Sequence, residues 1–193
     1  GLLPLALVLA TFVAIILGLG MPTTAAYIVC ATIIAPGLTE MGVTALGAHL
    51  FVLYFANMSN ITPPVALACY AASGIAGANP LSVSVKAFKL GLAGFLVPFA
   101  WVYGPQLIMD GEPFSVAYAA VTALVGILAL GASLQGIIGH RILGWPSRLC
   151  TAFAAVLLVM PGALTDGLAL ILILFPTIAI IWRNPRTPSS GLG

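Results

Sequence analysis

Charged residues are absent from two long stretches of the sequence, and this distribution constrains the fold more than any other feature. No Asp, Glu, Lys or Arg precedes Glu40, and none lies between Met41 and Val85. A charged side chain near the centre of a bilayer costs about 2.5 to 3.5 kcal/mol on insertion scales. Charges therefore mark the loops of a membrane protein, and both uncharged stretches are expected to be embedded in lipid.

The composition favours the same environment. Of 193 residues, 62% are hydrophobic and 5% are charged, whereas soluble domains carry roughly 25% charged residues. The few basic residues cannot form the surface that nucleic-acid binding needs, and the three cysteines lack the spacing of a zinc site or a disulfide framework. The chain opens in an apolar run without the basic region of a signal peptide. We therefore expect an all-α integral membrane protein, present here as the C-terminal fragment of a longer chain.

The first uncharged stretch predicts a re-entrant helical hairpin over residues 3–36. Its two apolar arms are separated by the sequence Gly18-Leu19-Gly20-Met21-Pro22-Thr23-Thr24. At 1.5 Å per residue each arm reaches about 20 Å, which is short of a hydrocarbon core of about 30 Å. Non-helical backbone at that depth needs protein or a watery cavity around it. The Gly-Met-Pro tip is therefore expected to face away from lipid.

The second uncharged stretch predicts one broken transmembrane helix over residues 44–77. Two apolar halves flank the polar sequence NMSNITPP at residues 57–64. Pro63 and Pro64 cannot continue the hydrogen-bond ladder, and each disfavours helical geometry at the residue before it. We expect Pro64 near the start of the second half-helix, where the missing donor costs nothing.

The remaining sequence predicts further spans. We expect Lys86 and Lys89 in a loop, followed by a span over residues 88–109 that completes a core of residues 1–110. A C-terminal transmembrane extension over 111–182 then holds a span from 116 to 138 and a final hairpin over 149–182, or one long tilted span. Asp166 is expected at the turn of that hairpin. The positive-inside rule puts the lysine loop in the cytoplasm and Asp110 outside. The Pro/Ser/Gly-rich tail 183–193 is expected to be disordered and cytoplasmic.

The polar residues in the break favour transport over catalysis. The sequence has no HExxH, GxSxG or P-loop motif, so we predict that the protein is not an enzyme. Neutral oxygen atoms beside backbone carbonyls freed from a helix suit a monovalent cation such as sodium, and unwound segments of this kind recur in secondary transporters. The candidate ligands are Asn57, Ser59, Asn60 and Thr62. The alternative is that these side chains only bond neighbouring helices.

The predicted hairpin tip supports the same interpretation. Thr23 and Thr24 begin the second arm, where hydroxyls and unpaired N–H groups could hold a carboxylate. Gly18 and Gly20 allow the backbone to approach other groups closely. The alternative is a proline-kinked hairpin that only packs.

At these residues the sequence resembles a known family. The two segments that carry the resemblance are GMPTTAAY at residues 20–27 and NMSNITPPVA at residues 57–66. Both are similar to the C-terminal half of the large membrane subunit of TRAP (tripartite ATP-independent periplasmic) transporters. The chain looks most like the fused permeases that work with TAXI-type binding proteins, with the small membrane subunit joined upstream. The resemblance covers about residues 1–110.

The resemblance implies a sodium-coupled transporter of the ion-transporter or elevator type in the prokaryotic cell (inner) membrane. A periplasmic solute-binding protein would deliver an organic anion, commonly a carboxylate, with sodium as coupling ion and no other cofactor. The implied sodium-site residues are Gly20 and Thr23 together with the polar residues of the break. Substrate would lie against the same tips, at Thr23, Thr24, Pro63 and Pro64.

Two alternatives stay open from the sequence. One is a sodium symporter of related architecture that works without a binding protein. The other is a non-transporting membrane scaffold in which the breaks serve packing. Sodium-dependent stability separates the scaffold from both transporters, because only a folded protein with a sodium site is stabilised by sodium.

Overall fold

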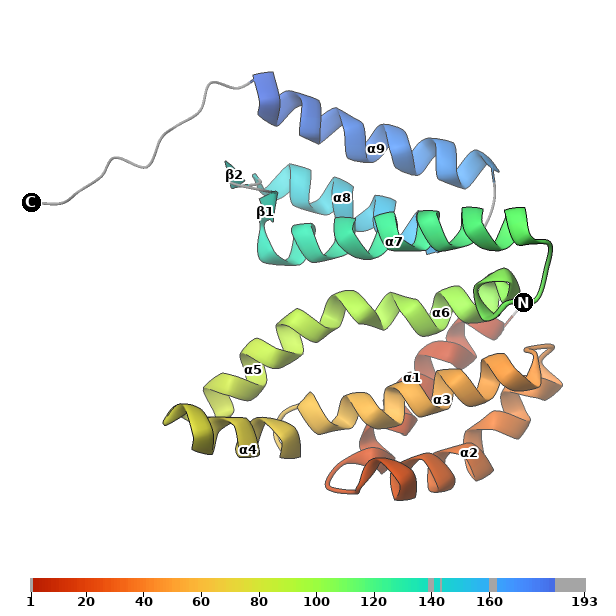
Figure 1. Ribbon diagram of the computed structural model, residues 1–193, viewed down its shortest axis with the longest axis vertical. Helices are drawn as coiled ribbons and strands as arrows, with labels where there is room; N and C mark the ends of the chain where they lie inside the picture. The colour runs from red at the N-terminus through yellow and green to blue at the C-terminus, as the bar shows by residue number, and fades with distance from the viewer. Residues whose placement is uncertain (1, 139–140, 143, 160–162, 183–193) are drawn as a thin grey trace, which may run out of the picture.

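The chain folds as a set of helices, as expected for an all-α membrane protein (Figure 1). The computed structural model describes residues 2–138, 141–142, 144–159 and 163–182, and for 137–138, 141–142, 159, 163–164 and 175–182 it describes the backbone alone. Within these described residues, three helical segments are long and apolar enough to cross a membrane: Thr23–Glu40, Pro80–Tyr103 and Pro113–Gln135. The chain is thus a multi-pass membrane protein.

The N-terminal hairpin consists of α1 (Leu3–Gly18) and α2 (Thr23–Glu40). Gly20 lies in the turn between them with a φ of 77°, a left-handed conformation that glycine adopts without steric cost. The second arm continues beyond the expected end at residue 36. Helix α2 continues through Pro36 to Glu40, although proline lacks the N–H that would donate to the carbonyl four residues earlier. The Thr39 hydroxyl donates to the Pro36 carbonyl over 2.7 Å.

The helix predicted over residues 44–77 is interrupted within the polar segment 57–64, as the sequence indicated. Helix α3 (Ala45–Met58) begins at Thr44, whose Oγ1 accepts from the Gly47 N–H over 3.2 Å. It passes into the short 3₁₀ helix η1 (Ser59–Ile61), and the chain resumes as α4 (Leu67–Ala76). Pro64 does not begin the second half-helix as we expected. Both prolines lie in the irregular segment, and α4 starts only after Ala66, which has a left-handed φ of 39°.

The next span begins earlier than the sequence suggested. Helix α5 (Pro80–Gly91) runs through η2 (Leu92–Phe95) into α6 (Leu96–Tyr103), and η3 (Pro105–Ile108) follows. Lys86 and Lys89 therefore lie on a helix, not in a loop. The early start has a local cause, because Asn79 accepts from the Ser82 N–H over 3.1 Å and Pro80 occupies the first turn.

Three further helices form the C-terminal part: α7 (Pro113–Gln135), α8 (Trp145–Val159) and α9 (Ala163–Trp182). Helix α8 packs against both α7 and α9. Between α7 and α8, β1 (Ile137–Ile138) pairs with β2 (Arg141–Ile142) as a short antiparallel hairpin. The residues of the expected turn at 160–162 and the expected tail at 183–193 lie outside the described residues. The division into three sequence regions stays a prediction.

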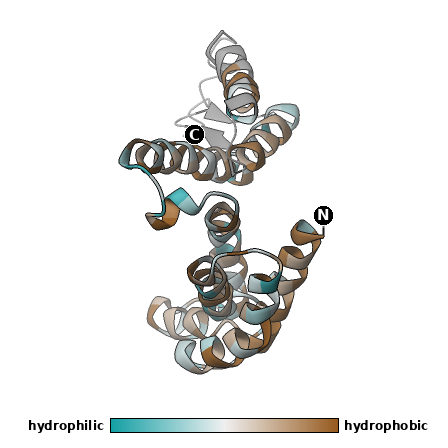
Figure 2. Cartoon of the chain, turned by 90° about the vertical axis from the view of Figure 1, so that its right-hand side faces the viewer, coloured by the Kyte–Doolittle hydropathy of each residue, from teal (hydrophilic) through white to brown (hydrophobic). Residues whose placement is uncertain are grey.

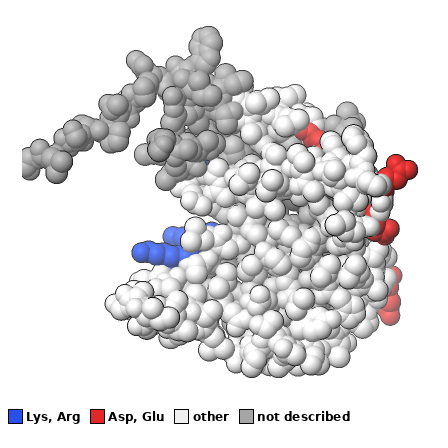
Figure 3. All heavy atoms as spheres, viewed as in Figure 1, with Lys and Arg blue, Asp and Glu red and all other residues white. Residues whose placement is uncertain are grey.

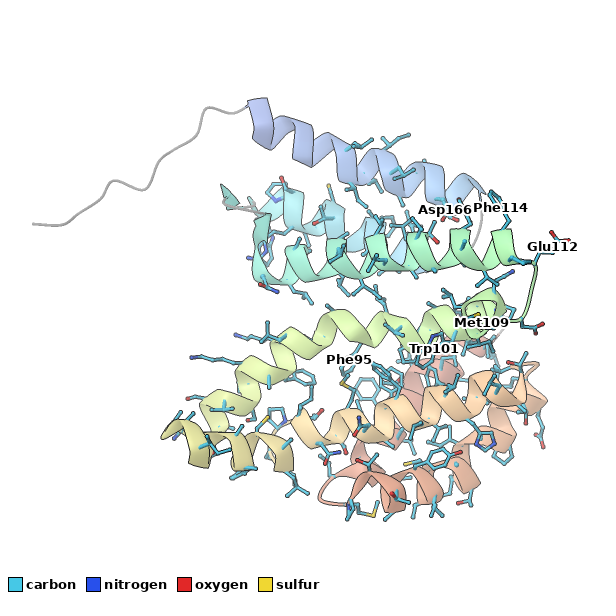
Figure 4. The ribbon with its side chains drawn as sticks, in the orientation of Figure 1. Phe95, Trp101, Met109, Glu112, Phe114 and Asp166 are labelled. Carbon is cyan, nitrogen blue, oxygen red and sulfur yellow. The ribbon has the colours of Figure 1, made fainter. Side chains whose placement is uncertain are left out.

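Asp166 differs from the expected turn residue. It lies in the first turn of α9 with 4% of its surface exposed, and Figure 4 shows it facing α7. Its Oδ2 accepts from the Tyr118 hydroxyl over 2.7 Å, whereas Oδ1 has no hydrogen-bond partner. The long-range partner on α7 draws the carboxylate between the helices.

The core of the first six helices combines small residues with aromatic rings in edge-to-face contact. Phe51 and Phe55 on α3 are completely buried and lie edge-to-face with a centroid separation of 4.8 Å. Phe95, labelled in Figure 4, and Phe99 complete the cluster from η2 and α6, at 5.4 Å and 5.9 Å from Phe55. Hydrophobic residues occur along most of the helices (Figure 2), and many large ones, such as Phe12, Ile33 and Leu128, are exposed, as the surface of a membrane protein requires.

Candidate functional site at the hairpin tip and the helix break

The end of α1 packs directly on the end of α3. The hydroxyl of Ser59, which is 1% exposed, lies 2.9 Å from the Gly18 carbonyl oxygen and 2.6 Å from that of Ala56. A Cβ added at Gly18 would lie 2.8 Å from Ser59 Oγ and 2.9 Å from Ala56 O, which is closer than real contacts. Gly18 is therefore required for this approach, and Ser59 fixes the tip to the break.

A second link joins the other arm of the hairpin to the break. Thr23, the first residue of α2, donates from Oγ1 to the side-chain oxygen Oδ1 of Asn57 over 3.1 Å. Asn60 donates from Nδ2 to Asn57 O over 3.2 Å and to Asn57 Oδ1 over 3.3 Å. Thr23 and Asn57 are exposed and Asn60 is half-buried. These side chains form an open cluster of neutral polar groups, unlike the dry contact at Ser59.

The remaining candidate residues lie around these two links. Gly20 lies beside the break, because a Cβ added there would be 3.7 Å from Val65 Cγ1. The hydroxyl of Thr62 donates to the Met58 carbonyl over 2.8 Å, and the Pro64 carbonyl accepts from the Tyr70 hydroxyl over 3.4 Å. Thr24 is exposed next to Thr23 on α2, and Pro63 lies in the irregular segment.

The helix ends give the site its electrostatic character. The first intrahelical bond of α2 runs from Ala26 N to Pro22 O, so the N–H groups of its first turn before Ala26 have no intrahelical acceptor. At the end of α3, the carbonyls of Ala56, Asn57 and Met58 accept hydrogen bonds from the side chains of Ser59, Asn60 and Thr62. The positive end of one helix dipole thus lies beside the negative end of another, which favours an anion at the first and a cation at the second. No charged side chain lies in residues 18–24 or 57–66.

The sequence did not indicate every contact that holds the two arms. The Tyr27 hydroxyl and His49 Nδ1 are 3.0 Å apart, about one turn above Thr23 on α2 and two turns above Asn57 on α3. Neither aromatic residue belongs to a motif that would pair them. Carbonyl groups such as those of Gly18 and Ala56 also contribute, and a backbone group has no sequence signature.

Comparison with known proteins identifies the family. The family model described as "Tripartite ATP-independent periplasmic transporter, DctM component" matches residues 2–110, which include the hairpin, the broken helix and the span that follows. This is a family of transporter components, not of enzymes. No curated protein and no solved structure gave a significant match. Because the family model matches more than half of the sequence, the chain belongs to the DctM component family of TRAP transporters.

Proposed function

We propose that this chain belongs to the permease of a sodium-coupled importer of an organic carboxylate, and that the hairpin tip and the helix break form part of its binding site. The observation that carries the proposal is the hydrogen bond between Thr23 and Asn57. It joins two helix ends, one from each interrupted element, through side-chain oxygens that are open to solvent. This is the arrangement that discontinuous helices provide in secondary transporters.

Sodium would bind on the side of the break. The oxygens of Thr23 and Asn57 already lie within hydrogen-bond distance, and rotation of the Thr23 hydroxyl would turn a lone pair toward a cation held between them. Asn60 is the third polar group of this cluster, and Thr62 follows in the same segment. Ser59 is buried and bonded to the hairpin, so its part is to position the tip.

The carboxylate substrate would bind on the side of the hairpin. The free N–H groups at the start of α2 are aligned donors, and a helix N-terminus attracts negative charge. The hydroxyl of Thr24 is exposed beside them, and Pro63 and Pro64 shape the opposite wall without adding charge. Sodium at the end of α3 would lower the electrostatic cost of a nearby carboxylate, which gives a physical basis for coupling.

The orientation follows from the charges. The ends that carry Glu40 and Asp110 lie on one side of the molecule in Figure 1, and the start of α5, which precedes Lys86 and Lys89, lies on the other. Under the positive-inside rule the lysine side is cytoplasmic. The hairpin then opens to the periplasm, from which a solute-binding protein would deliver the substrate. By its motif sequences we propose the fused TAXI-type permease, with the small membrane subunit upstream.

The test is uptake of candidate carboxylates by the full-length protein in proteoliposomes, with and without an inward sodium gradient and with and without its cognate binding protein. Uptake that needs both agrees with the proposal, whereas sodium-driven uptake without the partner would identify a simpler symporter. If the folded protein takes up no carboxylate under any of these conditions, the non-transporting membrane scaffold is favoured.

Variants then test the site itself. Thr23→Val keeps the shape of the side chain but removes its oxygen, so sodium-driven uptake should fall, while Thr23→Ser should retain it. Asn57→Ala and Thr62→Ala should also lower uptake without changing membrane abundance. Undiminished uptake by Thr23→Val and Asn57→Ala would contradict the site assignment even if transport itself were sodium-coupled.

A further inference from the structure

Lys86 and Lys89 are the two lysines of the chain, and neither has an acidic partner available. Both are exposed on α5. The four acids lie elsewhere: Asp166 is bonded to Tyr118, and the others end α2 or connect η3 to α7. Figure 3 shows acidic side chains along one edge of the molecule and lysine side chains at the opposite edge. The lysines are therefore cations without a counterion in the described part of the chain.

The lysines lie where two helices diverge. Helix α7 passes close to η2, since a Cβ added at Gly131 would be 3.8 Å from Ala93 Cβ. From that point α5 runs away from α7 toward α4 (Figure 1), leaving a wedge between the two helices. Figure 3 shows the lysine side chains at the mouth of an indentation on this edge. Helical side chains tilt toward the N-terminus of their helix, which here directs both ammonium groups outward.

Apolar side chains continue from the lysines toward the apex of this wedge. Lys86, Lys89 and Leu90 recur at helical spacing, and the same stripe leads to Ala93 at the apex. On α7, Leu134 lies one turn beyond Gly131, on the side of the apex where α5 and α7 diverge (Figure 1). Leu90 and Leu134 are 63% and 37% exposed. The wedge thus combines an apolar wall with a cationic mouth.

We propose that this wedge binds one anionic phospholipid of the cytoplasmic leaflet. Its phosphate accepts hydrogen bonds from the ammonium groups of Lys86 and Lys89, and an acyl chain lies along Leu90 and Leu134. Basic pockets between transmembrane helices at the cytoplasmic side are suited to anionic headgroups. A soluble organic anion would leave the apolar wall uncovered. A zwitterionic lipid has no net charge and would balance neither lysine, whereas an anionic phospholipid places a net negative charge beside them.

The experiment is native mass spectrometry of the full-length protein in detergent, with equal amounts of phosphatidylglycerol and phosphatidylcholine. The unmodified protein should retain phosphatidylglycerol preferentially. At about 1 kcal/mol for each lysine, Lys86→Gln with Lys89→Gln should lower that preference up to about 30-fold, and each single change about fivefold. The Lys86→Arg, Lys89→Arg protein should keep it. Arg183→Gln with Arg186→Gln is the matched control, because it removes the same number of positive charges at positions remote from α5 in the sequence.

The outcomes separate the alternatives without a transport assay, so they do not depend on the proposed function. Undiminished phosphatidylglycerol preference in the glutamine variant, or an equal loss in the arginine control, would overturn the proposal. Displacement of the lipid by an equal concentration of inorganic phosphate would identify a soluble-anion site instead. Elution volume and thermal unfolding without lipid establish that each variant is folded. If the double glutamine variant does not fold, the single lysine variants take its place in the test.

Discussion

Replacement of Gly18 by alanine tests the contact on which the geometry of the site depends. The added methyl group would lie 2.8 Å from Ser59 Oγ, 3.1 Å from Ser59 Cβ and 2.9 Å from Ala56 O. The last of these is a backbone atom, so no side-chain rotation relieves the clash. Overpacking of this kind costs about 1 to 3 kcal/mol. Displacement of Ser59 would also weaken a buried hydrogen bond worth about 0.5 to 1.5 kcal/mol.

The helix itself gives a smaller opposing term. Alanine is favoured over glycine inside a helix by up to about 1 kcal/mol, although Gly18 is the last residue of α1, where the gain is reduced. We therefore expect a net loss of about 1 to 3 kcal/mol in the free energy of unfolding, set mainly by the overpacking term. Gly37→Ala is a matched control, because Gly37 lies within α2 and a Cβ there meets no atom within 4 Å. That variant should be neutral or slightly stabilised.

Thermal unfolding of the purified full-length protein measures both variants, and a double variant identifies the cause. Ser59→Ala removes one of the clashing atoms, so Gly18→Ala combined with Ser59→Ala should be less destabilised than the sum of the single changes. Coupling between residues in contact is about 0.5 to 3 kcal/mol. An unfolding temperature of Gly18→Ala equal to that of Gly37→Ala would refute the close approach of tip and break.

Three further predictions concern ligand binding and the C-terminal helices. If sodium binds the folded state and not the unfolded state, sodium chloride at 100 times the dissociation constant should stabilise the protein by about 2.7 kcal/mol relative to choline chloride. Asn57→Ala should reduce this difference, and equal unfolding temperatures in both salts would argue against the site. Tyr118→Phe removes the partner of Oδ2 of buried Asp166, whose Oδ1 already has none, so it should lower the unfolding temperature, and adding Asp166→Asn should recover part of the loss. A Tyr118→Phe protein as stable as the original would show that the bond contributes nothing. Arg148 donates to the carbonyls of Ser133 and Leu134 at the end of α7, each over 2.8 Å, so Arg148→Ala should lower the free energy of unfolding by about 1.5 to 3 kcal/mol. Arg148→Lys should lose less stability than Arg148→Ala but more than none, because lysine lacks the planar fork, and full stability with lysine would indicate that charge alone matters.

The interruptions are predictable from the sequence because their cause is local. Glycine and proline weaken the interior of a helix, and the chain breaks near Gly20 and in the segment that holds Pro63 and Pro64. The start of α5 is harder to locate, because two lysines suggest a loop, whereas a capping asparagine and Pro80 begin a helix ahead of them. Long side chains let lysine remain on a membrane helix while its charge reaches the headgroup region.

Long-range pairs are not predictable for a different reason. An isolated acid such as Asp166 suggests a turn because it has no evident partner in the sequence, and its partner Tyr118 lies 48 positions away. The Ser59 contact depends on two backbone carbonyls, which every residue possesses. Polar composition thus locates the candidate site without indicating which of its side chains are buried and which are exposed.

The buried and the exposed polar side chains of the candidate site have different expected roles. Ser59 is buried and bonded to two carbonyls from different helices, so its loss should lower stability without removing the exposed side-chain oxygens of Thr23 and Asn57. Thr23 and Asn57 are exposed, and the bond between them contributes little to stability in water-accessible surroundings, yet their oxygens are available to a cation. Variants at Ser59 should therefore change the unfolding temperature more than its dependence on sodium, and variants at Asn57 should do the reverse. A common response of both properties to either change would mean that the tip and the break act as a single unit.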